Sequence, residues 1–223
     1  GVEGIRPQAY DRPELPLLAS TVSAGVAAAL VVAAYLIGTF PTAWLATRGH
    51  GFDPTRVGSG NPGATNVLRV AGRRAGALAL VGDVLKGAVP AAAGWAIGGH
   101  GVGVACGVAA VVGHVLPVTR SFRGGKGVAT GAGMAVVLFP AAAAVAIAGF
   151  AVTIALTRTA SLGSIVAAVL LPVGAAAFGA PGREVAALAG CAALIVGRHR
   201  ANIDRLRRGT EPRLGAERPG TTG

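Results

Sequence analysis

Long stretches of alanine, valine, leucine and glycine, almost free of charged residues, run through the chain from residue 21 to residue 196. Most of them are long enough to cross a hydrocarbon core about 30 Å thick as a helix, which rises about 1.5 Å per residue. Hydrophobic residues make up 52% of the sequence and charged residues 13%, which is unlike a soluble domain. We therefore predict an all-α, polytopic integral membrane protein with about seven transmembrane helices, some of them short. The expected spans are residues 21–47, 75–99, 102–116, 127–139, 140–156, 162–178 and 183–196.

Two prolines are expected to interrupt these apolar stretches. Pro41 should kink the first span, because proline lacks the N–H that continues the helical hydrogen bonds. The apolar stretch 127–156 is too long for one span, and Pro140 near its middle predicts a tight turn between two short helices. The polar segments 48–74 and 118–126 then become loops, and the 36 glycines indicate close contact between helices in lipid.

The positive charges are distributed unevenly along the chain and predict its orientation. With seven spans, nearly all of the 20 lysines and arginines fall on one side of the membrane, which marks this side as cytoplasmic. The exceptions are Arg6, Arg12 and Arg183 on the other side and Lys86 within a span. We therefore expect an extracytoplasmic N-terminal arm over residues 1–20, a seven-helix membrane domain over 21–200 and a basic cytoplasmic tail over 201–223. This distribution also accounts for the net charge of +11 without a nucleic acid partner.

The densest cluster of small, cationic and hydroxyl residues lies at positions 113–131, which read GHVLPVTRSFRGGKGVATG. Glycines flank Lys126 on both sides, which would allow backbone N–H groups to approach an anion closely. The segment lacks the spacing of a P-loop, and a flexible basic loop between two membrane helices is the alternative to a phosphate site. The candidate phosphate-binding residues here are Arg123, Gly124, Gly125, Lys126, Gly127 and Thr130.

A second candidate anion site lies in the segment GSGNPGATNVLR at positions 58–69. Its glycines and the Asn61-Pro62 pair favour tight turns, and its amide and hydroxyl side chains can donate hydrogen bonds to phosphate. Arg69 adds a guanidinium that can bind phosphate through two N–H groups. The candidate residues are Ser59, Gly60, Asn61, Asn66 and Arg69.

Ionisable and hydroxyl residues near the other expected cytoplasmic ends are further candidates. Asp83 and Lys86 are neighbours on one helix face within a span, where they either serve a functional site or hold helices together as an ion pair. His114, at the end of the third span, is either a helix-end group or a part of the site. Ser161, Ser164, His199 and Asn202 fall near the same side of the membrane. The sequence shows no metal-ligand motif, and we expect neither a metal nor a cofactor.

Converging phosphate-binding groups at a membrane surface suit a donor that carries its own leaving group. An acyl phosphate is such a donor, because the protein would mainly need to position the reactants and stabilise charge while phosphate departs. A membrane transporter for a small organophosphate is the alternative, and it predicts charges deep within several spans and internal repeats. A scaffold whose basic loops bind anionic lipid is a second alternative.

Three segments of the chain resemble, in the same order, the motifs of the bacterial acyl-phosphate:glycerol-3-phosphate acyltransferases. They are GSGNPGATNVLR at 58–69, GHVLPVTRSFRGGKGVAT at 113–130 and RHRANIDRLRRGTE at 198–211, within a resemblance that covers about residues 28–213. It implies a multi-pass, seven-helix enzyme of the bacterial cytoplasmic (inner) membrane, with its active site facing the cytoplasm.

The implied reaction transfers a fatty acyl group from acyl phosphate to the 1-hydroxyl of sn-glycerol 3-phosphate. Its products are lysophosphatidic acid (1-acyl-sn-glycerol 3-phosphate) and phosphate, and it is the first acylation of phospholipid synthesis. The implied partners are the two substrates and membrane lipid, with no obligate protein partner.

The resemblance also implies roles for single residues. Ser59 and Arg69 match the phosphate-binding residues of the first motif, with Asn61 and Asn66 beside them. Lys126, in its setting of glycines, matches the phosphate-binding lysine of the second motif.

His199 and Asn202 match the essential residues of the third motif, and Ser164 corresponds by spacing to a family serine, with Ser161 as the alternative. In the implied mechanism the 1-hydroxyl of glycerol 3-phosphate attacks the acyl carbonyl while Lys126 and the loop N–H groups hold phosphates. Ser164 and Asn202 would orient the acceptor or polarise the carbonyl. The proton would pass either to His199 or to the substrate's own phosphate.

Overall fold

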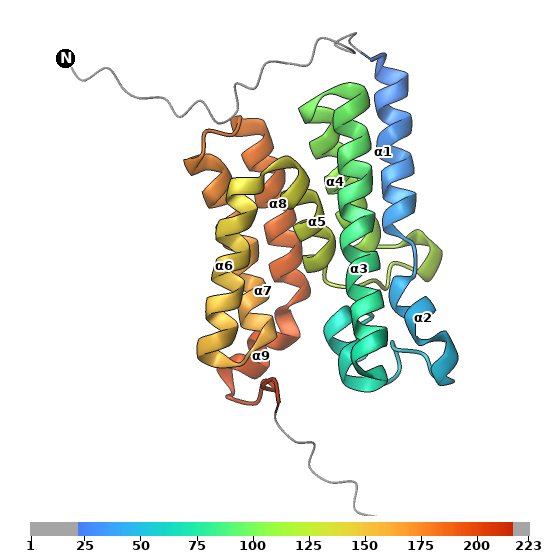
Figure 1. The fold of residues 1–223 in the computed structure, drawn as a ribbon, viewed down its shortest axis with the longest axis vertical. Coiled ribbons are helices and arrows are strands. Elements are labelled where there is room, and N and C mark those ends of the chain that lie inside the picture. Colours follow the sequence, from blue (N-terminus) through green and yellow to red (C-terminus); the bar gives the residue numbers. More distant parts are fainter. Residues whose placement is uncertain (1–21, 216–223) are drawn as a thin grey trace, which may run out of the picture.

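A computed structural model of the chain describes residues 22–215, and the expected arm 1–20 and the last residues of the tail lie outside this part. The described residues form helices and loops without a strand, which confirms the predicted all-α class (Figure 1). The α-helices are α1 (Ala24–Gly38), α2 (Thr42–Thr47), α3 (Ala64–Gly98), α4 (His100–Val115), α5 (Val128–Leu138), α6 (Pro140–Thr157), α7 (Ala160–Ala177), α8 (Gly182–Arg198) and α9 (Arg200–Arg207), and two short 3-10 helices cover Arg48–His50 and Val118–Arg120.

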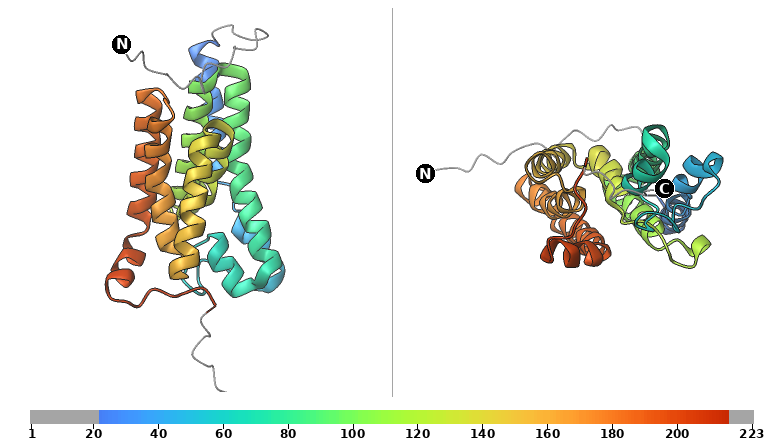
Figure 2. Two further views of the ribbon diagram at one scale, coloured as in Figure 1. Left: turned by 60° about the vertical axis from the view of Figure 1, so that its left-hand side comes forward. Right: turned by 90° about the horizontal axis from the view of Figure 1, so that it is seen from below.

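The long helices stand side by side and run alternately up and down (Figure 1). Helices α1 to α4 form one group and α6 to α8 form another, with α5 between them (Figure 2). The short helices α2 and α9 lie together with the start of α3 at one end of the molecule (Figure 1). This end therefore collects segments that are far apart in the sequence.

Five helical segments of the described residues are long and apolar enough to cross a membrane. They are Ala24–His50, Ala64–Gly98, His100–Arg120, Pro140–Thr157 and Ala160–Ala177. Helix α5 has 11 residues and α8 has 17, so these two expected spans are shorter than the others. The structure thus has the composition of a membrane helix bundle. By length and apolar character alone, five of its helical segments qualify as membrane spans, compared with the seven spans expected.

Both prolines act where the sequence predicts. The first span breaks at Pro41, because α1 ends at Gly38 and α2 begins at Thr42. Pro140 is the first residue of α6, a position where its missing N–H costs no helical hydrogen bond. The predicted turn between α5 and α6 is therefore confirmed.

The expectation that residues 48–74 form a loop is wrong for residues 64–74, which belong to α3. Helix α3 begins at Ala64, and the chain bends sharply at Gly72, whose φ of 83° lies in the left-handed region that favours glycine. The two parts of α3 fold back on each other, since a Cβ at Gly76 would lie 2.7 Å from the Cβ of Leu68. The bend keeps residues 64–71 at the end of the bundle.

Glycines allow helices α1, α3, α4 and α5 to approach one another closely, as the sequence indicates. A Cβ at Gly87 of α3 would lie 1.9 Å from the carbonyl oxygen of Thr130 in α5. A Cβ at Gly38 of α1 would lie 2.2 Å from the carbonyl oxygen of Ala110 in α4. Backbone in contact with backbone gives tight packing where lipid supplies no hydrophobic driving force.

Candidate active site

A cavity of about 750 Å³ is lined by residues of α3, α5, α6, α7, α8 and α9. One end is polar and basic. The polar side chains that line the cavity are Ser59, Asn61, Thr65, Asn66, Arg69, Asp83, His114, Lys126, Ser161, Ser164, His199, Asn202, Arg205 and Glu211. The remaining wall is mostly apolar and includes Val128, Ala135, Ala143, Ala146, Ile147, Phe150, Ala168 and Leu171. One cavity thus joins a polar end rich in cations to a mostly apolar wall.

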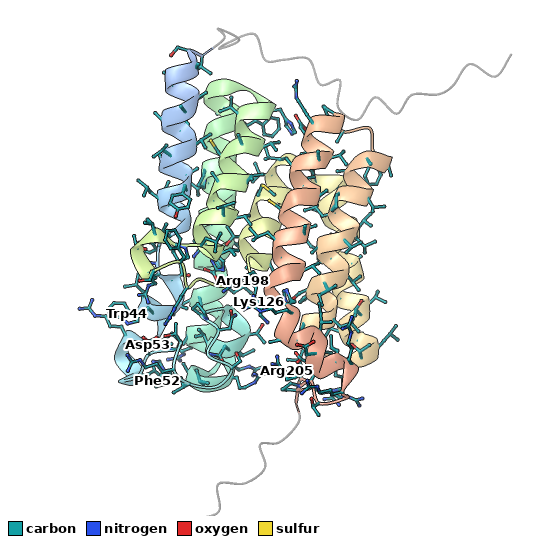
Figure 3. All side chains as sticks on the ribbon, turned by 180° about the vertical axis from the view of Figure 1, so that it is seen from behind. Trp44, Phe52, Asp53, Lys126, Arg198 and Arg205 are labelled. Carbon is teal, nitrogen blue, oxygen red and sulfur yellow. The ribbon has the colours of Figure 1, made fainter. Side chains whose placement is uncertain are left out.

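Lys126 lies at the polar end, just before α5. Its Nζ donates a hydrogen bond of 2.5 Å to Oδ1 of Asn202 on α9. The pKa of Lys126 is lowered to about 8, mainly by burial, and the charges of Arg205 and Arg198 contribute to the lowering while Glu211 opposes it. Figure 3 shows Lys126 and Arg198 near one another between the two helix groups. Because burial and like charges destabilise this ammonium group, an anion bound beside it gains more from the interaction.

His199 is 1% exposed and joins α8 to α9. Its Nδ1 lies 2.7 Å from the carbonyl oxygen of Ile195. A carbonyl can only accept, so Nδ1 carries the hydrogen and Nε2 is left as an acceptor in the neutral ring. Burial lowers the pKa of His199 to about 4, with a further contribution from the charge of Lys126. The ring therefore offers a hydrogen-bond acceptor at neutral pH.

Glu211 is a member of the site that the sequence interpretation missed. Its Oε1 accepts hydrogen bonds from Ser161 Oγ at 2.7 Å and Asn202 Nδ2 at 2.6 Å, and its Oε2 accepts one from Arg205 Nε at 2.7 Å. Burial opposes ionisation, but these hydrogen bonds outweigh it and keep the pKa of Glu211 below its usual value. Glu211 is one of only two acids, with Asp204, among the arginines of residues 198–213, and this was the signal in the sequence.

The two candidate serines of α7 both line the cavity but have different partners. Ser161 is buried and its hydroxyl is engaged by Glu211. Ser164 donates to the carbonyl oxygen of Ala160 in its own helix, at 2.8 Å, so its oxygen can still accept a hydrogen bond. Both serines stay candidates for the site.

The first glycine-rich segment reaches the cavity through Ser59, Asn61 and Arg69. Asn66 also lines it, but its amide serves the loop. Its Oδ1 accepts from Ser59 N at 2.9 Å, and its Nδ2 donates to the carbonyl oxygens of Pro54 and Val57 at 3.0 and 3.1 Å. Both donors of the Asn66 amide are thus used, and the residue holds Ser59 in place.

Some predicted phosphate-binding residues do not line this cavity. They are Gly60, Arg123, Gly124, Gly125 and Thr130. Thr130 is fully buried against α3. Gly125 cannot offer its N–H to an anion, because this group donates to the carbonyl oxygen of His114 at 3.0 Å. Gly124 instead accepts a hydrogen bond of 2.9 Å from Arg198 Nη2 through its carbonyl oxygen.

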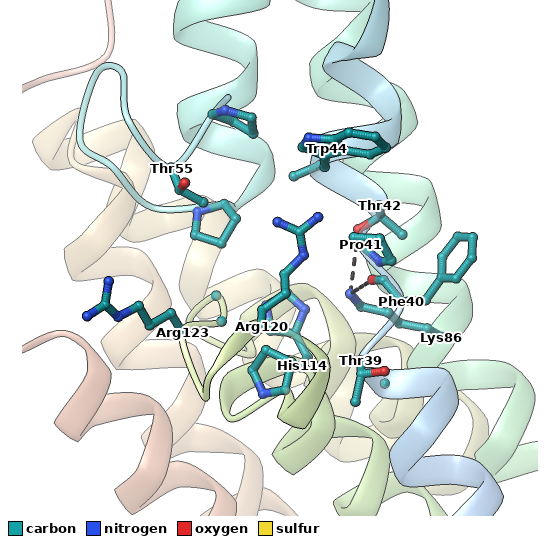
Figure 4. Close-up of a pocket in the computed structure, with 17 residues that line it drawn as sticks. Thr39, Phe40, Pro41, Thr42, Trp44, Thr55, Lys86, His114, Arg120 and Arg123 are labelled. Carbon is teal, nitrogen blue, oxygen red and sulfur yellow. Dashed lines mark hydrogen bonds between the residues drawn. The ribbon is translucent and has the colours of Figure 1, made fainter. Parts of the chain in front are cut away.

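Arg123 faces a separate, much smaller cavity on the other side of the glycine segment, shown in Figure 4. Arg120 in the same cavity lies over the ring of Trp44, with its guanidinium carbon 5.9 Å from the ring centroid. Figure 4 shows Arg123 extending away from Arg120 and Trp44. The three cations of this segment therefore face different cavities. Arg120 and Arg123 line the small cavity, and Lys126 lines the large one.

The chain is similar in sequence to known proteins over most of its length. A sequence model of a family described as "Glycerol-3-phosphate acyltransferase" matches residues 28–209. A relative of that name from Thioalkalivibrio sulfidiphilus is 45% identical over 192 residues, which cover 85% of this chain and 95% of the relative. Another of that name, from Pseudomonas paraeruginosa, is 47% identical over 189 residues, covering 82% and 96%.

Two solved structures are also similar to this chain. One is a crystal structure of PlsY (YgiH), described as an integral membrane glycerol 3-phosphate acyltransferase in its glycerol 3-phosphate form. Its TM-score is 0.82 at 37% sequence identity, with 86% of this chain and 96% of that chain covered. The second is the lysophosphatidic acid form, with a TM-score of 0.80 at the same identity and coverage.

Proposed function

The chain belongs to the glycerol-3-phosphate acyltransferase family, and we propose that it transfers a fatty acyl group from acyl phosphate to the 1-hydroxyl of sn-glycerol 3-phosphate. The products would be lysophosphatidic acid and inorganic phosphate. The structures of PlsY in glycerol 3-phosphate and lysophosphatidic acid forms support the acceptor and the product. The transporter alternative finds no support among these relatives.

The observation that carries this proposal is the continuity of a basic end and an apolar wall within one cavity. The acceptor is small and anionic, so it needs only the basic end. An acyl donor needs both, because its phosphate must lie among cations while its chain lies in an apolar channel. The proposal therefore uses the whole cavity, whereas a site for a small organophosphate would leave the apolar wall without a role.

Two cations are proposed to hold the phosphates. Lys126 lies beside Asn202 at the inner part of the polar end, and Arg69 lies on the folded-back start of α3. Ser59, with its backbone held by Asn66, would add a hydroxyl donor. Fixed donors and cations in a site that excludes water stabilise the developing charge more strongly than water does.

The proton of the attacking hydroxyl is proposed to leave with phosphate. Neutral His199 offers Nε2 as a hydrogen-bond acceptor, which would orient the hydroxyl toward the acyl carbonyl. A ring with a pKa of about 4 is a weak base, and the departing phosphate is a stronger one. Ser164 or Ser161, together with Asn202, would polarise the carbonyl or hold the acceptor.

We propose seven membrane crossings by α1, α3, α4, α5, α6, α7 and α8, in a bacterial cytoplasmic membrane. The alternating directions of these helices support this count (Figure 1). Helix α5 is about 17 Å long at 1.5 Å per residue, so the glycine segment before it would have to enter the membrane from the cytoplasmic side. The cations near α2 and α9 support a cytoplasmic location for that side, which would put the N-terminus outside and the C-terminus inside.

The test is phosphate release by purified protein in lipid, given palmitoyl phosphate with and without glycerol 3-phosphate. We expect release that depends on the acceptor and is lost in Lys126→Ala. Arg183→Ala removes an exposed cation at the start of α8, outside the cavity, and should behave as the unchanged protein does. Folded protein that releases no phosphate in response to the acceptor would overturn the proposal.

A further inference from the structure

A buried chain of contacts links the break between α1 and α2 to the glycine segment that carries Lys126. We infer that His114, oriented by the ion pair of Asp83 and Lys86, is a positioning residue for Lys126. This inference rests on the proposed function, because it needs Lys126 to hold a substrate phosphate.

The glycine segment packs directly on His114. Gly125 N–H donates to the carbonyl oxygen of His114 at 3.0 Å. A Cβ at Gly124 would lie 2.0 Å from that oxygen, and a Cβ at Gly125 would lie 2.1 Å from His114 Nε2. Both glycines are therefore required by the space that His114 occupies, and the ring of His114 bounds the residue that directly precedes Lys126.

The ring of His114 faces the buried ion pair. Its Nδ1 lies 3.6 Å from Oδ1 of Asp83, longer than a hydrogen bond but within electrostatic contact. The same oxygen lies 2.9 Å from Lys86 Nζ and accepts a hydrogen bond from Thr42. Asp83 is 2% exposed and Lys86 is 7% exposed. Charges this deep in a membrane bundle persist only when they are paired.

Lys86 connects the pair to the first two helices. Its Nζ donates to the carbonyl oxygen of Phe40 at 3.0 Å, in the break between α1 and α2 (Figure 4). That carbonyl has lost its helical partner because the helix stops there. The ion pair of Asp83 and Lys86 thus connects the break between α1 and α2 to α3 and α4. His114 of α4 in turn contacts the glycine segment.

The cluster borders both cavities. Asp83 and His114 line the large cavity, and Lys86 and His114 line the small one. His114 therefore stands at the wall between them, behind the backbone of Gly125. On the opposite side, Arg198 holds Gly124. With both sides fixed, Lys126 Nζ has a defined place beside Asn202, and loosening either side would move it.

The consequence for kinetics is a change in substrate binding. Displacing a binding group by 1 Å can cost about 100-fold in activity. A residue that holds Lys126 in place should raise KM for the substrate whose phosphate Lys126 binds, with a smaller effect on kcat. Lys126→Arg keeps the charge but changes the geometry, so the substrate whose KM rises in this variant identifies that phosphate.

The experiment measures kcat and KM for acyl phosphate and glycerol 3-phosphate in protein reconstituted in lipid. His114→Leu removes the donor that faces Asp83, and His114→Asn keeps one on that side of the residue. We expect KM to rise by about 10- to 100-fold in His114→Leu for the same substrate as in Lys126→Arg, and by less in His114→Asn. His100→Leu is the matched control, because His100 pairs with Glu184 at the other end of the bundle, and it should leave both KM values unchanged.

A double-mutant cycle tests whether the ion pair acts through His114. Asp83→Asn is combined with Lys86→Met so that no charge is left unpaired. In the His114→Leu background this pair of changes should raise KM by less than about 2-fold, because coupled residues are not additive. Fully additive effects would overturn the role of the ion pair, and a fall in kcat with unchanged KM would overturn the positioning role of His114.

Two further outcomes separate this inference from the proposed function. If the unchanged protein shows no acceptor-dependent phosphate release, the proposed function fails. If that release is normal and both His114 variants keep the KM values of the unchanged protein, only the positioning role fails. Should His114→Leu not fold, His114→Asn and the Asp83–Lys86 replacement still decide the matter.

Discussion

Lys126 and Asn202 are 76 residues apart in the chain, and their Nζ and Oδ1 atoms meet at 2.5 Å. The hydrogen bond joins the segment before α5 to α9. It therefore exists only when the second helix group has packed against the first. A charged donor makes such a bond roughly twice as strong as a neutral pair. The polar end of the cavity is thus a product of the tertiary fold.

The first prediction concerns pH. The pKa of Lys126 is about 8 in the substrate-free protein, so its charge is present below this pH and is lost as the pH rises through it. We expect kcat/KM to fall above about pH 8, because neutral lysine no longer binds phosphate. Lys126→Arg should be weaker overall but should lack this alkaline fall, since arginine stays charged. A fall of equal midpoint in both proteins would contradict the assignment.

The second prediction concerns His199. His199→Asn keeps a donor near the position of Nδ1 but has no group in place of Nε2. We expect kcat to fall by about 100-fold or more, as for loss of a group that orients the attacking hydroxyl, with a nearly unchanged unfolding temperature. The profile of kcat/KM should show no histidine step between pH 5 and 7, because burial keeps the pKa of His199 at about 4. A step near pH 6.5 that disappears in His199→Asn would show that the ring titrates normally.

The third prediction concerns the end of the chain. Glu211 holds residues after α9 against Ser161 and Asn202. Glu211→Gln weakens charged hydrogen bonds worth about 1.5–3 kcal/mol each, so local opening should become at least about 10-fold more frequent. Limited trypsin digestion after the arginines of α9 should accelerate accordingly. Asp204→Asn, on the exposed side of the same helix, is the control, and equal digestion of the two variants would refute the role of Glu211.

The fourth prediction concerns the acyl chain. Ala143 of α6 is buried and lines the apolar wall. Ala143→Phe should fill that part of the channel, so kcat/KM for palmitoyl phosphate should fall by about 10-fold or more relative to decanoyl phosphate, because overpacked side chains cannot be accommodated. Ala144→Phe places the same side chain on the exposed face of α6 and should leave that ratio unchanged. An unchanged ratio in Ala143→Phe would mean that the chain lies elsewhere.

Much of this fold could be predicted because lipid and proline impose strong local rules. The break at Pro41 and the start of α6 at Pro140 follow from a missing N–H. The reversal at Gly72 was missed, since polar residues before it suggested a loop. A left-handed glycine within a helix cannot be told from a packed glycine by sequence alone. The sequence therefore did not predict that α3 begins at Ala64 or that Arg69 lies on this helix.

The candidate site could be predicted as a set of segments but not in its internal arrangement. Lys126, His199 and Asn202 line one cavity, and their roles stay predictions. Gly124 and Gly125 were interpreted as a cradle for an anion, whereas the space they leave is filled by His114. The sequence shows that glycine has no side chain, but only the three-dimensional structure shows which neighbouring group occupies the space.

The polar end and the apolar wall of the cavity are built from different residues, mostly on different segments. Under the proposed function, selection for a new membrane fatty-acid composition can therefore act on positions such as Ala143 and Ala146 without disturbing Lys126 or His199. Lineages living at different temperatures could adjust chain length in this way, one small side chain at a time, while the chemistry of the head group is inherited unchanged.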